Sequence, residues 1–404
     1  MKILHLCDSL NPAGLGGYES IIHYLAKAMV PEGVESFVVT QSPNRDSPQV
    51  VQREHYTIYY LTGNLLEARK WEFFSLPEEK KARAVDELFK PSDLNENVDL
   101  LEEQLVRLID ELHPDIIHAH SIYVVFNRVI AQLCESSRLK IPVVVTIHGL
   151  PKSLILPDGT ETTDYKEFAS FFNFDLVIAV SENVAEALKK HLDSEHRDKV
   201  RTLYSGIDLT VFKPLPELKK DWDLAFMGRL ESMKSVDLFP EMLSILKRRF
   251  PKITMMMTGE GSLKDRLFDE FREKGVVSMV EYKGVVDPDE VPILINKSRI
   301  FLYPSRQEPF GLSIVEAMAC GVPVVTTNVY GPREIVRNNH DGVTVPPDDV
   351  EALAEAVEIL LKDRELREHL GRNAVKTAHD RYDIRQHARQ LLGIYNETIE
   401  GKKK

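Results

Sequence analysis

The sequence predicts an α/β protein built from two doubly wound domains in series. The chain has 404 residues, more than a single ordinary core accommodates. In both halves, short apolar runs alternate with amphipathic stretches, which is the pattern of strands joined by helices. A proline-containing stretch at 212–216 separates the halves, and we expect it to be the linker.

In the first half, five apolar runs are expected to form strands. They are nearly continuous rather than alternating, which is typical of a parallel sheet covered on both faces. These runs lie at 3–7, 36–40, 116–120, 143–147 and 176–180, and a helix is expected at 19–29. The first domain is predicted to span residues 1–212.

The segment 62–112 is longer than an ordinary connection between strands. It holds 13 acidic and 7 basic residues and contains helix-like stretches such as 100–112. We expect a solvated helical insertion in the first domain. A cap that shapes an acceptor site is the alternative interpretation.

The second half repeats the alternation of strands and helices. Its expected strands lie at 223–227, 253–258, 280–283, 300–303 and 322–326. Pro304 ends one strand, and a loop over 305–310 leads into a helix that ends near Cys320, with Gly321 as its cap. The second domain is predicted to span 213–383, followed by a helix within 384–404.

Composition restricts the possible functions. The net charge of −12 argues against a nucleic-acid-binding protein. The three cysteines offer neither a disulfide framework nor metal-ligand spacing. No apolar run approaches the roughly 18 residues of a membrane span, and the first residues predict a strand rather than a signal peptide. We expect a cytoplasmic protein, and peripheral contact with the inner membrane face stays open.

Two carboxylates, Glu308 and Glu316, stand on either side of the predicted helix start. A helix N-terminus offers unpaired N–H groups and a positive dipole end to a phosphate. Carboxylates beside it accept hydrogen bonds from sugar and ribose hydroxyls. Both should face one crevice at the carboxyl ends of the strands, which favours a sugar nucleotide as the ligand. A capped helix with two exposed glutamates is the structural alternative.

Two cations and several glycines lie in loops that follow predicted strands. Arg229 and Lys234 follow the first strand of the second domain, where fixed cations suit a diphosphate. Gly16 and Gly17 follow the first strand of the chain, and Gly259 follows another. Glycine allows close backbone approach to a ligand, although a tight turn explains it equally well. The dinucleotide fingerprint Gly-x-Gly-x-x-Gly is absent.

Histidines end two strands of the first domain. His118 and His120 alternate along one strand, and we expect one on each face. His148 ends another strand and is a weaker candidate. A histidine at such a place is more often packed than catalytic. No metal site of recognised spacing is present.

The run from Glu308 to Val325 reads Glu-Pro-Phe-Gly-Leu, then Glu-Ala-Met-Ala, then Gly-Val-Pro-Val-Val. It closely resembles the E-x7-E segment of retaining glycosyltransferases with the GT-B fold, specifically the large family 4. Further matches follow in the family's order from Gly16 to about Pro347 and cover most of the chain. Ser235 departs from the pattern, because the family has glycine after the lysine.

The resemblance implies two Rossmann-like domains facing a central cleft, with the C-terminal helix crossing back to the first domain. It implies that Arg229 and Lys234 neutralise the donor diphosphate, that Glu308 orients the donor sugar and that Glu316 binds the ribose. It places His120 near the transferred sugar and His148 on the acceptor side. The remaining donor-binding residues that it implies are Gly16, Gly17, Gly259, Val285, Phe310, Gly311 and Leu312.

The expected function is therefore that of a retaining, metal-independent hexosyltransferase without a cofactor. The donor would be a UDP- or GDP-sugar, and the acceptor a hydroxyl of a sugar, a lipid or a small metabolite. A nucleotide-sugar epimerase of the same fold is one alternative. A non-catalytic sugar-nucleotide-binding subunit is another. Product analysis separates the three.

Overall fold

The computed structural model describes residues 1–7, 17–41, 49–61, 91–120, 125–155, 161–170 and 172–403. The chain divides into two compact units. The first contains the N-terminal strand, Tyr18–Leu203 and Ala388–Lys404, and the second contains Tyr204–His387. Each unit has its own sheet and its own core, which confirms the prediction of two Rossmann-like domains.

The sheet of the first unit has eight strands in the order β10-β9-β6-β5-β1-β2-β4-β3. All neighbours are parallel except β3 and β4. The strands are β1 (Lys2–Cys7), β2 (Glu35–Gln41), β3 (Gln49–Gln52), β4 (Tyr56–Leu61), β5 (Ile116–His120), β6 (Val143–Ile147), β9 (Leu176–Ala179) and β10 (Val200–Thr202). A separate pair is formed by β7 (Ser153–Ile155) and β8 (Glu161–Thr163).

All five strands expected in the first half are present, whereas β3, β4, β7, β8 and β10 were not predicted. β1, β5 and β6 are almost wholly buried, so their apolar runs were easy to recognise. β3 is largely exposed at the sheet edge, and β10 has only three residues. Such strands bury too little side chain to leave a hydrophobic pattern.

The helices of the first unit follow the expected alternation with strands. They are α1 (Gly17–Met29), η1 (Val30–Glu32), α4 (Pro91–Leu112), α5 (Val125–Glu135), α6 (Asp164–Ser170), α7 (Glu182–Lys189) and α8 (Ser194–Arg197). α4 packs on α5 and confirms helix in the last part of the acidic segment. Residues 62–90 of that segment lie outside the described residues.

The second unit has a six-stranded sheet, parallel throughout, in the order β13-β12-β11-β14-β15-β16. Its strands are β11 (Trp222–Met227), β12 (Met255–Thr258), β13 (Val280–Tyr282), β14 (Ser298–Tyr303), β15 (Val324–Thr327) and β16 (Val343–Val345). The five strands predicted here are present. The sixth, β16, has three residues, of which only Val345 is buried.

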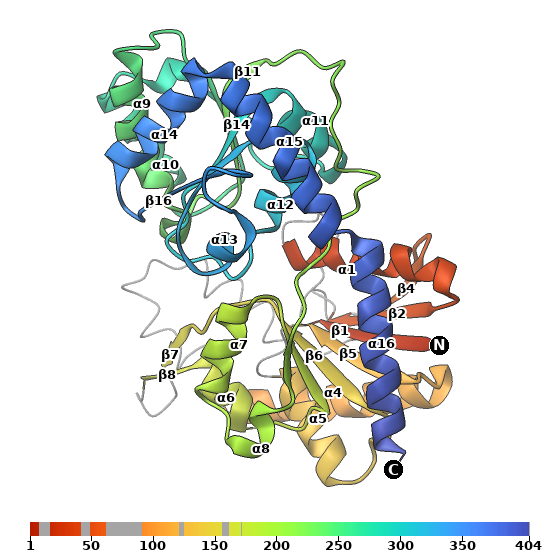
Figure 1. The fold of residues 1–404 in the computed structure, drawn as a ribbon. Coiled ribbons are helices and arrows are strands. Elements are labelled where there is room, and N and C mark those ends of the chain that lie inside the picture. The colour runs from red at the N-terminus through yellow and green to blue at the C-terminus, as the bar shows by residue number, and fades with distance from the viewer. Residues whose placement is uncertain are drawn as a thin grey trace. The chain divides into compact units, whose positions relative to one another are not determined.

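Helices cover both faces of this sheet (Figure 1). One group is α9 (Phe239–Lys247), α10 (Lys264–Glu273) and α14 (Val350–Lys362); the other is α11 (Val291–Asn296), α12 (Leu312–Ala319) and α15 (Arg364–Arg381). The unit also contains α13 (Tyr330–Ile335), η2 (Ser232–Lys234), η3 (Val236–Leu238), η4 (Val277–Met279) and η5 (Pro288–Glu290).

The division between the units falls after Leu203, upstream of the expected linker at 212–216. Hydrogen bonds give the reason, because residues after Leu203 are tied to the end of the second unit. The Ile207 N–H donates to the Tyr382 carbonyl oxygen at 2.8 Å, and the Ile384 N–H donates to the Ile207 carbonyl oxygen at 2.9 Å. A proline pattern cannot reveal such long-range pairing.

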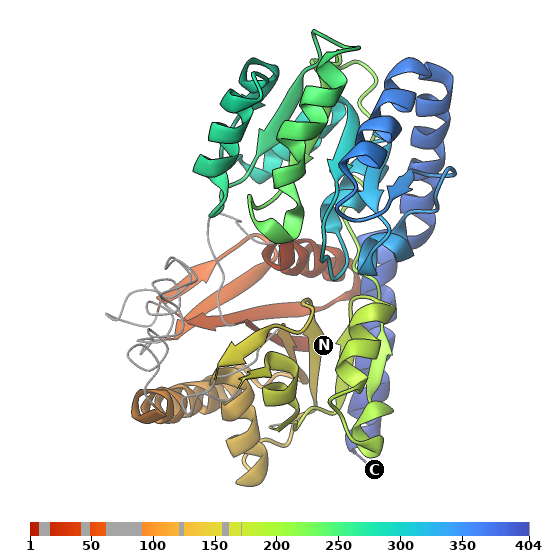
Figure 2. The same cartoon turned by 90° about the vertical axis from the view of Figure 1, so that its left-hand side faces the viewer.

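The last helix, α16 (Ile384–Lys402), begins in the second unit and from Ala388 onward belongs to the first. It lies along the first unit in both views (Figures 1 and 2). Lys402 forms an ion pair with Asp175, and Arg201 forms one with Glu397. The buried Tyr395 hydroxyl bonds to His118 of β5.

Each sheet has a topological switch point, where the chain continues from one central strand to a neighbour on one side and later returns to a neighbour on the other side. In the first unit β1 lies between β2 and β5, and in the second β11 lies between β12 and β14. Ligands of open α/β sheets bind beyond the carboxyl ends of strands at such switch points. β1 with β5, and β11 with β14, therefore mark the places to search for a site.

Candidate functional site

The loops after β11 and β14 bring Lys234 and Glu308 together, although 74 positions separate them in the sequence. Lys234 ends the short η2 helix, and Glu308 lies in the loop before α12. The Lys234 Nζ donates to the Glu308 carboxylate and, at 2.8 Å, to the Tyr303 hydroxyl. It also lies 4.9 Å from the centre of the Tyr303 ring. All three side chains are buried.

The charge state of this cluster follows from its contacts. Burial acts to lower the pKa of Lys234, but the Tyr303 hydroxyl and the Glu308 carboxylate outweigh it, so that the pKa is raised above its ordinary value. Burial, with the charge of Glu308, raises the pKa of Tyr303. The cluster is therefore an ammonium ion held by a carboxylate and a neutral phenol. A buried cation needs such partners, because an unpaired one is costly.

The loop that carries Glu308 is held from several sides. Gly331 donates its N–H to the Glu308 carbonyl oxygen at 3.0 Å. Phe310 is buried and packs near the rings of Tyr204 and Tyr382. Gly311 has a φ of 112°, which L side chains rarely adopt, and it precedes Leu312 at the start of α12. No side chain caps this helix start within the described residues.

Glu316 lies one turn inside α12 and keeps part of its surface accessible. Its carboxyl group nevertheless lies deep among protein atoms, and this burial raises its pKa from 4.5 to about 7. In the described part of the chain, it has no hydrogen-bonding or ionic partner. A carboxyl group without a partner among the described residues, on a side chain that is partly accessible, is available for a ligand's hydroxyls.

The other residues predicted for the second unit lie in neighbouring loops. Arg229 is exposed, with its guanidinium 3.5 Å from the Met233 sulfur. Val285 is half exposed. Gly259 has a φ of 110°, and a Cβ there would lie 2.0 Å from the Gly228 carbonyl oxygen. Its lack of a side chain thus serves the contact between two loops, a use that the sequence does not distinguish from ligand approach.

Gly16 lies outside the described residues, and Gly17 begins α1. The expectation that His118 and His120 lie on opposite faces of β5 is wrong. Residues i and i+2 of a strand share a face, and the two ring centres lie 4.0 Å apart. His5 of β1 joins them, because it is the register partner of His118 in the neighbouring strand.

The imidazoles form a hydrogen-bonded chain. His5 Nδ1 lies 3.1 Å from His120 Nε2, and His120 Nδ1 lies 3.3 Å from His148 Nε2. His118 is held separately by Thr146, at 2.7 Å, and by Tyr395. Burial lowers the pKa of His5 to about 4, so this end of the chain is neutral near pH 7.

Three of these histidines are also close enough to share a metal ion. Ligand atoms of His5, His118 and His120 lie within 4.8 Å of one another, all buried. Both ring nitrogens of His118 already have hydrogen-bond partners, and His5 and His120 bond to each other. The Nε2 atom of His5 is buried and has no hydrogen-bond partner among the described residues, so these contacts do not satisfy every ring nitrogen of the cluster. The absence of a metal from the reaction stays a prediction.

The sequence missed three side chains that support the candidate residues. Tyr303 ends a buried strand and looked like core. His5 has the same appearance within β1. Arg306 lies two residues before the matched run and drew no attention; it contacts Asp237 and Asp348. An apolar strand end followed by a polar loop was the only available signal.

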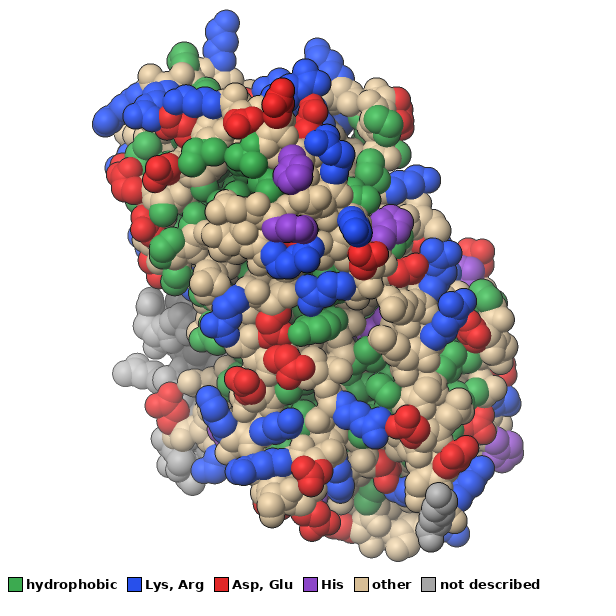
Figure 3. Space-filling model, in the orientation of Figure 1, with side chains coloured by type: hydrophobic (Ala, Val, Ile, Leu, Met, Phe, Trp, Pro, Cys, Tyr) green, Lys and Arg blue, Asp and Glu red, His purple; other side chains and the backbone are tan. Residues whose placement is uncertain are grey.

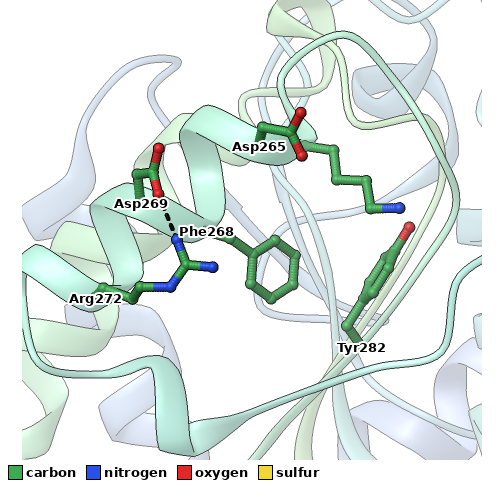
Figure 4. A pocket seen from close by; sticks show the side chains of 6 residues that line it. Asp265, Phe268, Asp269, Arg272 and Tyr282 are labelled. Carbon is green, nitrogen blue, oxygen red and sulfur yellow. Dashed lines mark hydrogen bonds and ion pairs between the residues drawn. The ribbon is translucent and has the colours of Figure 1, made fainter.

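A hollow of about 400 Å³ lies beside α10, away from the Lys234 cluster (Figure 4). It is lined by Lys264, Asp265, Phe268, Asp269, Arg272 and Tyr282. Its cations are paired, Lys264 with Glu260 and Arg272 with Asp269. The Tyr282 hydroxyl, in the wall of the hollow, donates to the carbonyl oxygen of Gly259 at 2.7 Å and so contacts one of the predicted donor-binding loops. None of the described residues predicted to bind the donor lines the hollow itself.

Two family models match consecutive parts of the chain. Residues 15–211 match glycosyltransferase family 4, and residues 208–377 match glycosyl transferases group 1. The chain is 28% identical to a D-inositol 3-phosphate glycosyltransferase of Paenarthrobacter aurescens over 96% of this chain and 94% of that protein. It is 28% identical to a glycogen synthase of Mycobacterium tuberculosis over 72% of this chain and 70% of that protein.

Solved structures support the fold. Sucrose-phosphate synthase of Thermosynechococcus elongatus has a TM-score of 0.78 at 20% identity, covering 99% of both chains. Anabaena HepE, in complex with UDP and glucose, has a TM-score of 0.72 at 20% identity, covering 98% of this chain and 99% of that one. Together, the matched domains and these structures show that the chain is a GT-B glycosyltransferase and belongs to glycosyltransferase family 4.

Proposed function

We propose that this glycosyltransferase moves a hexosyl unit from a UDP- or GDP-sugar to a hydroxyl group with retention of configuration. The observation that carries the proposal is the buried Lys234–Glu308 pair at the switch point of β11 and β14. It sits beside the start of α12, and Glu316 follows one turn later. This arrangement offers a cation and a helix N-terminus to a diphosphate, and carboxylates to hydroxyls.

The leaving nucleoside diphosphate develops negative charge as the glycosidic bond breaks. Lys234 and the N–H groups at Gly311 and Leu312 are the groups that would stabilise it, joined by the exposed Arg229. Fixed cations and backbone dipoles can perform this task without a metal ion. A nearby buried cation has a larger effect than an exposed one, because water screens it less.

The two carboxylates have separate tasks in this proposal. Glu308 accepts hydrogen bonds from hydroxyls of the donor sugar and fixes its orientation. Glu316, whose carboxyl group has no partner within the described chain, accepts hydrogen bonds from the ribose hydroxyls. We assign Glu308 to orientation rather than nucleophilic attack, and the leaving phosphate takes the acceptor proton.

His120 is the first-unit residue that we propose to act near the transferred sugar, with His148 on the acceptor side. The orientation of the His120 ring is supported by hydrogen bonds at both of its ring nitrogens, to His5 and to His148. The acceptor class stays open among sugars, lipids and small metabolites. No helix of the described residues is long and apolar enough to cross a membrane. On the face drawn in Figure 3, acidic and basic side chains are interspersed.

The first experiment is a thermal-shift series with UDP, GDP, ADP and their common sugar conjugates in the absence of added metal. A ligand that binds only the folded protein raises its Tm in a concentration-dependent way. We expect one nucleotide class to raise the Tm. UDP is the first choice, because HepE is in complex with UDP and glucose in its structure.

Product analysis with the sugar conjugate of that nucleotide then tests the reaction. Transfer to an acceptor with the donor's anomeric configuration supports the proposal. An epimerised nucleotide sugar, or inversion at the anomeric carbon, would overturn it. Binding without any product would favour a non-catalytic subunit.

A further inference from the structure

Arg306 lies between the two loops that carry Lys234 and Glu308. It follows β14 and precedes Glu308 by two residues. Its backbone N–H donates to the Met233 carbonyl oxygen at 2.9 Å, next to Lys234 in the chain. Gln307 donates to the same oxygen at 3.4 Å. The backbone of the Glu308 loop is therefore bonded directly to the turn that presents Lys234.

The guanidinium of Arg306 strengthens this contact through its planar set of donors. Nη1 and Nη2 donate to the two carboxylate oxygens of Asp237, at 2.8 and 2.7 Å, and Nη1 also donates to the Ser232 carbonyl oxygen at 2.6 Å. Nε donates to Asp348 at 2.6 Å. Ser232 and Asp237 stand on either side of Lys234, so a single guanidinium holds both ends of the turn. Such two-point binding fixes orientation as well as distance.

The turn itself contains a strained residue. Ser235 has a φ of 52° and is fully buried. This left-handed conformation is unfavourable for a residue with a Cβ atom. The Ser235 hydroxyl has no hydrogen-bond partner among the described residues. The surroundings must therefore impose this conformation, and the bonds from Arg306 lie on both sides of it.

We propose that Arg306 is a positioning residue that holds Lys234 at the donor diphosphate by clamping the turn from Ser232 to Asp237. The inference rests on the proposed function, because it assigns a diphosphate to Lys234. Arg306 acts through Lys234 and does not itself touch the donor. Asp237 is its principal partner, since that carboxylate accepts both arms of the guanidinium fork.

A purely structural strut and a positioning residue predict different binding behaviour. Substitution of a residue with a purely structural role lowers Tm, or lowers the affinity for every nucleotide by the same factor. A residue that positions Lys234 affects ligands with a second phosphate and spares those without one. The discriminating quantity is therefore the ratio of the affinities for UDP and UMP, measured by calorimetry on the full chain. GDP and GMP replace them if the thermal-shift series selects guanine.

The variants are Arg306→Lys, Asp237→Asn and the double variant. Lysine keeps the charge but loses the fork, so Arg306→Lys isolates the two-point contact. We expect UDP affinity to fall about tenfold, the effect of weakening one charge-assisted contact, while UMP affinity is unchanged. The double variant should lose no more than Arg306→Lys alone, because both substitutions remove the contact between Arg306 and Asp237.

The matched control is Arg299→Lys. Arg299 pairs with Asp223 at 2.8 Å and links the same two strands, β14 and β11, at their opposite ends. It should leave the UDP to UMP ratio unchanged. Equal losses for UDP and UMP in Arg306→Lys, or the same ratio change in the Arg299 control, would overturn the inference.

Lys234→Met separates a failure of this inference from a failure of the proposed function. Loss of UDP affinity in Lys234→Met together with an unaffected Arg306→Lys rejects the clamp alone. An unchanged UDP affinity in Lys234→Met rejects the diphosphate assignment, and the clamp with it. Addition of Ser235→Gly to Arg306→Lys should recover part of the UDP affinity, because glycine adopts the turn without strain.

Discussion

The two switch points of this glycosyltransferase are built from different chemistry. Beyond β11 and β14, Lys234 and Glu308 form a charged pair that loops bring together. Beside β1 and β5, His5 and His120 form a contact whose geometry is fixed by strand register. A charged pair needs precise loops to hold it, whereas a row of imidazoles needs only neighbouring strands and burial.

The same difference decides how each site responds to change. In the second unit, the loop at Gly259 lies directly against the Gly228 carbonyl group, and Arg306 joins the Glu308 loop to the turn that carries Lys234. A substitution in these loops is therefore expected to move the Lys234 ammonium group. In the first unit, burial keeps His5 neutral. Because a neutral imidazole has one donor and one acceptor, the tautomer of His5 decides whether its Nδ1 donates to His120 Nε2 or accepts from it.

The largest effect is expected at the charged switch point. Lys234→Met should lower kcat about a thousandfold, the scale on which removal of a group that stabilises transition-state charge acts. It also leaves the Glu308 carboxylate buried without its cation, which lowers stability. The double variant Lys234→Met with Glu308→Gln removes both charges and should recover Tm but not kcat. Steady-state kinetics and thermal unfolding provide the measurements.

The control for this variant is Lys274→Met. Lys274 forms an exposed pair with Glu241, and exposed pairs contribute little. Near-normal turnover of Lys234→Met would show that the second switch point does not carry the chemistry.

The next effect tests the imidazole chain. His120→Ala should lower kcat about a hundredfold, the scale of one lost hydrogen bond to a group that carries charge in the transition state. His5 acts only through His120, so His5→Leu should have a smaller effect. We expect kcat to fall about tenfold, which corresponds to the net free energy of one hydrogen bond. His5→Asn, whose amide can replace Nδ1, should recover most of this loss. Equal kcat values for the leucine and asparagine variants would argue that His5 is only core.

A pH dependence is expected at Glu316, in the second unit. Its pKa is raised from 4.5 to about 7 by burial, so between these pH values the unfolded chain has lost the proton that the folded protein keeps. Stability contributed by the protonated carboxyl group is therefore present at low pH and is lost as pH rises through this window. The loss is on the order of 3 kcal/mol.

Denaturant unfolding between pH 4 and pH 8 measures this effect. Glu316→Gln should flatten the fall in stability, because glutamine does not titrate, and should exceed the wild type most clearly above pH 7. A parallel pH profile for the two proteins would remove Glu316 as a titrating group. His5→Asn provides the opposite comparison in the first unit, because burial lowers the pKa of His5 from 6.5 to about 4. It should remove a rise in stability between these pH values and leave the fall due to Glu316 in place.

The smallest effect separates loop contact from backbone conformation. Gly259→Ala should destabilise the second unit by about 2 kcal/mol or more, because it adds a clash with the Gly228 carbonyl to an unfavourable φ. Gly33→Ala is the matched control in the first unit, since Gly33 has a φ of 72° and nothing within 4 Å of its missing Cβ. It should cost about 1 kcal/mol, the cost of the conformation alone.

Much of the fold could be predicted because buried parallel strands leave continuous apolar runs. Ile116–His120 and Val143–Ile147 were located to the residue. The short edge strands β3 and β16 bury too little to leave a pattern. The unit boundary was displaced, because pairing between Ile207 and Asp383 depends on residues far away in the chain.

The sequence by itself determined the fold class, the family, the loops that carry Lys234 and Glu308, and the helix that carries Glu316. These properties follow from local hydrophobic periodicity and from a continuous motif. Only the tertiary structure decided which groups meet: Tyr303 and Glu308 around Lys234, Arg306 with Asp237, and His5 with His120. Such contacts join residues distant in sequence, and their geometry is set by strand order and loop packing, which no local pattern encodes.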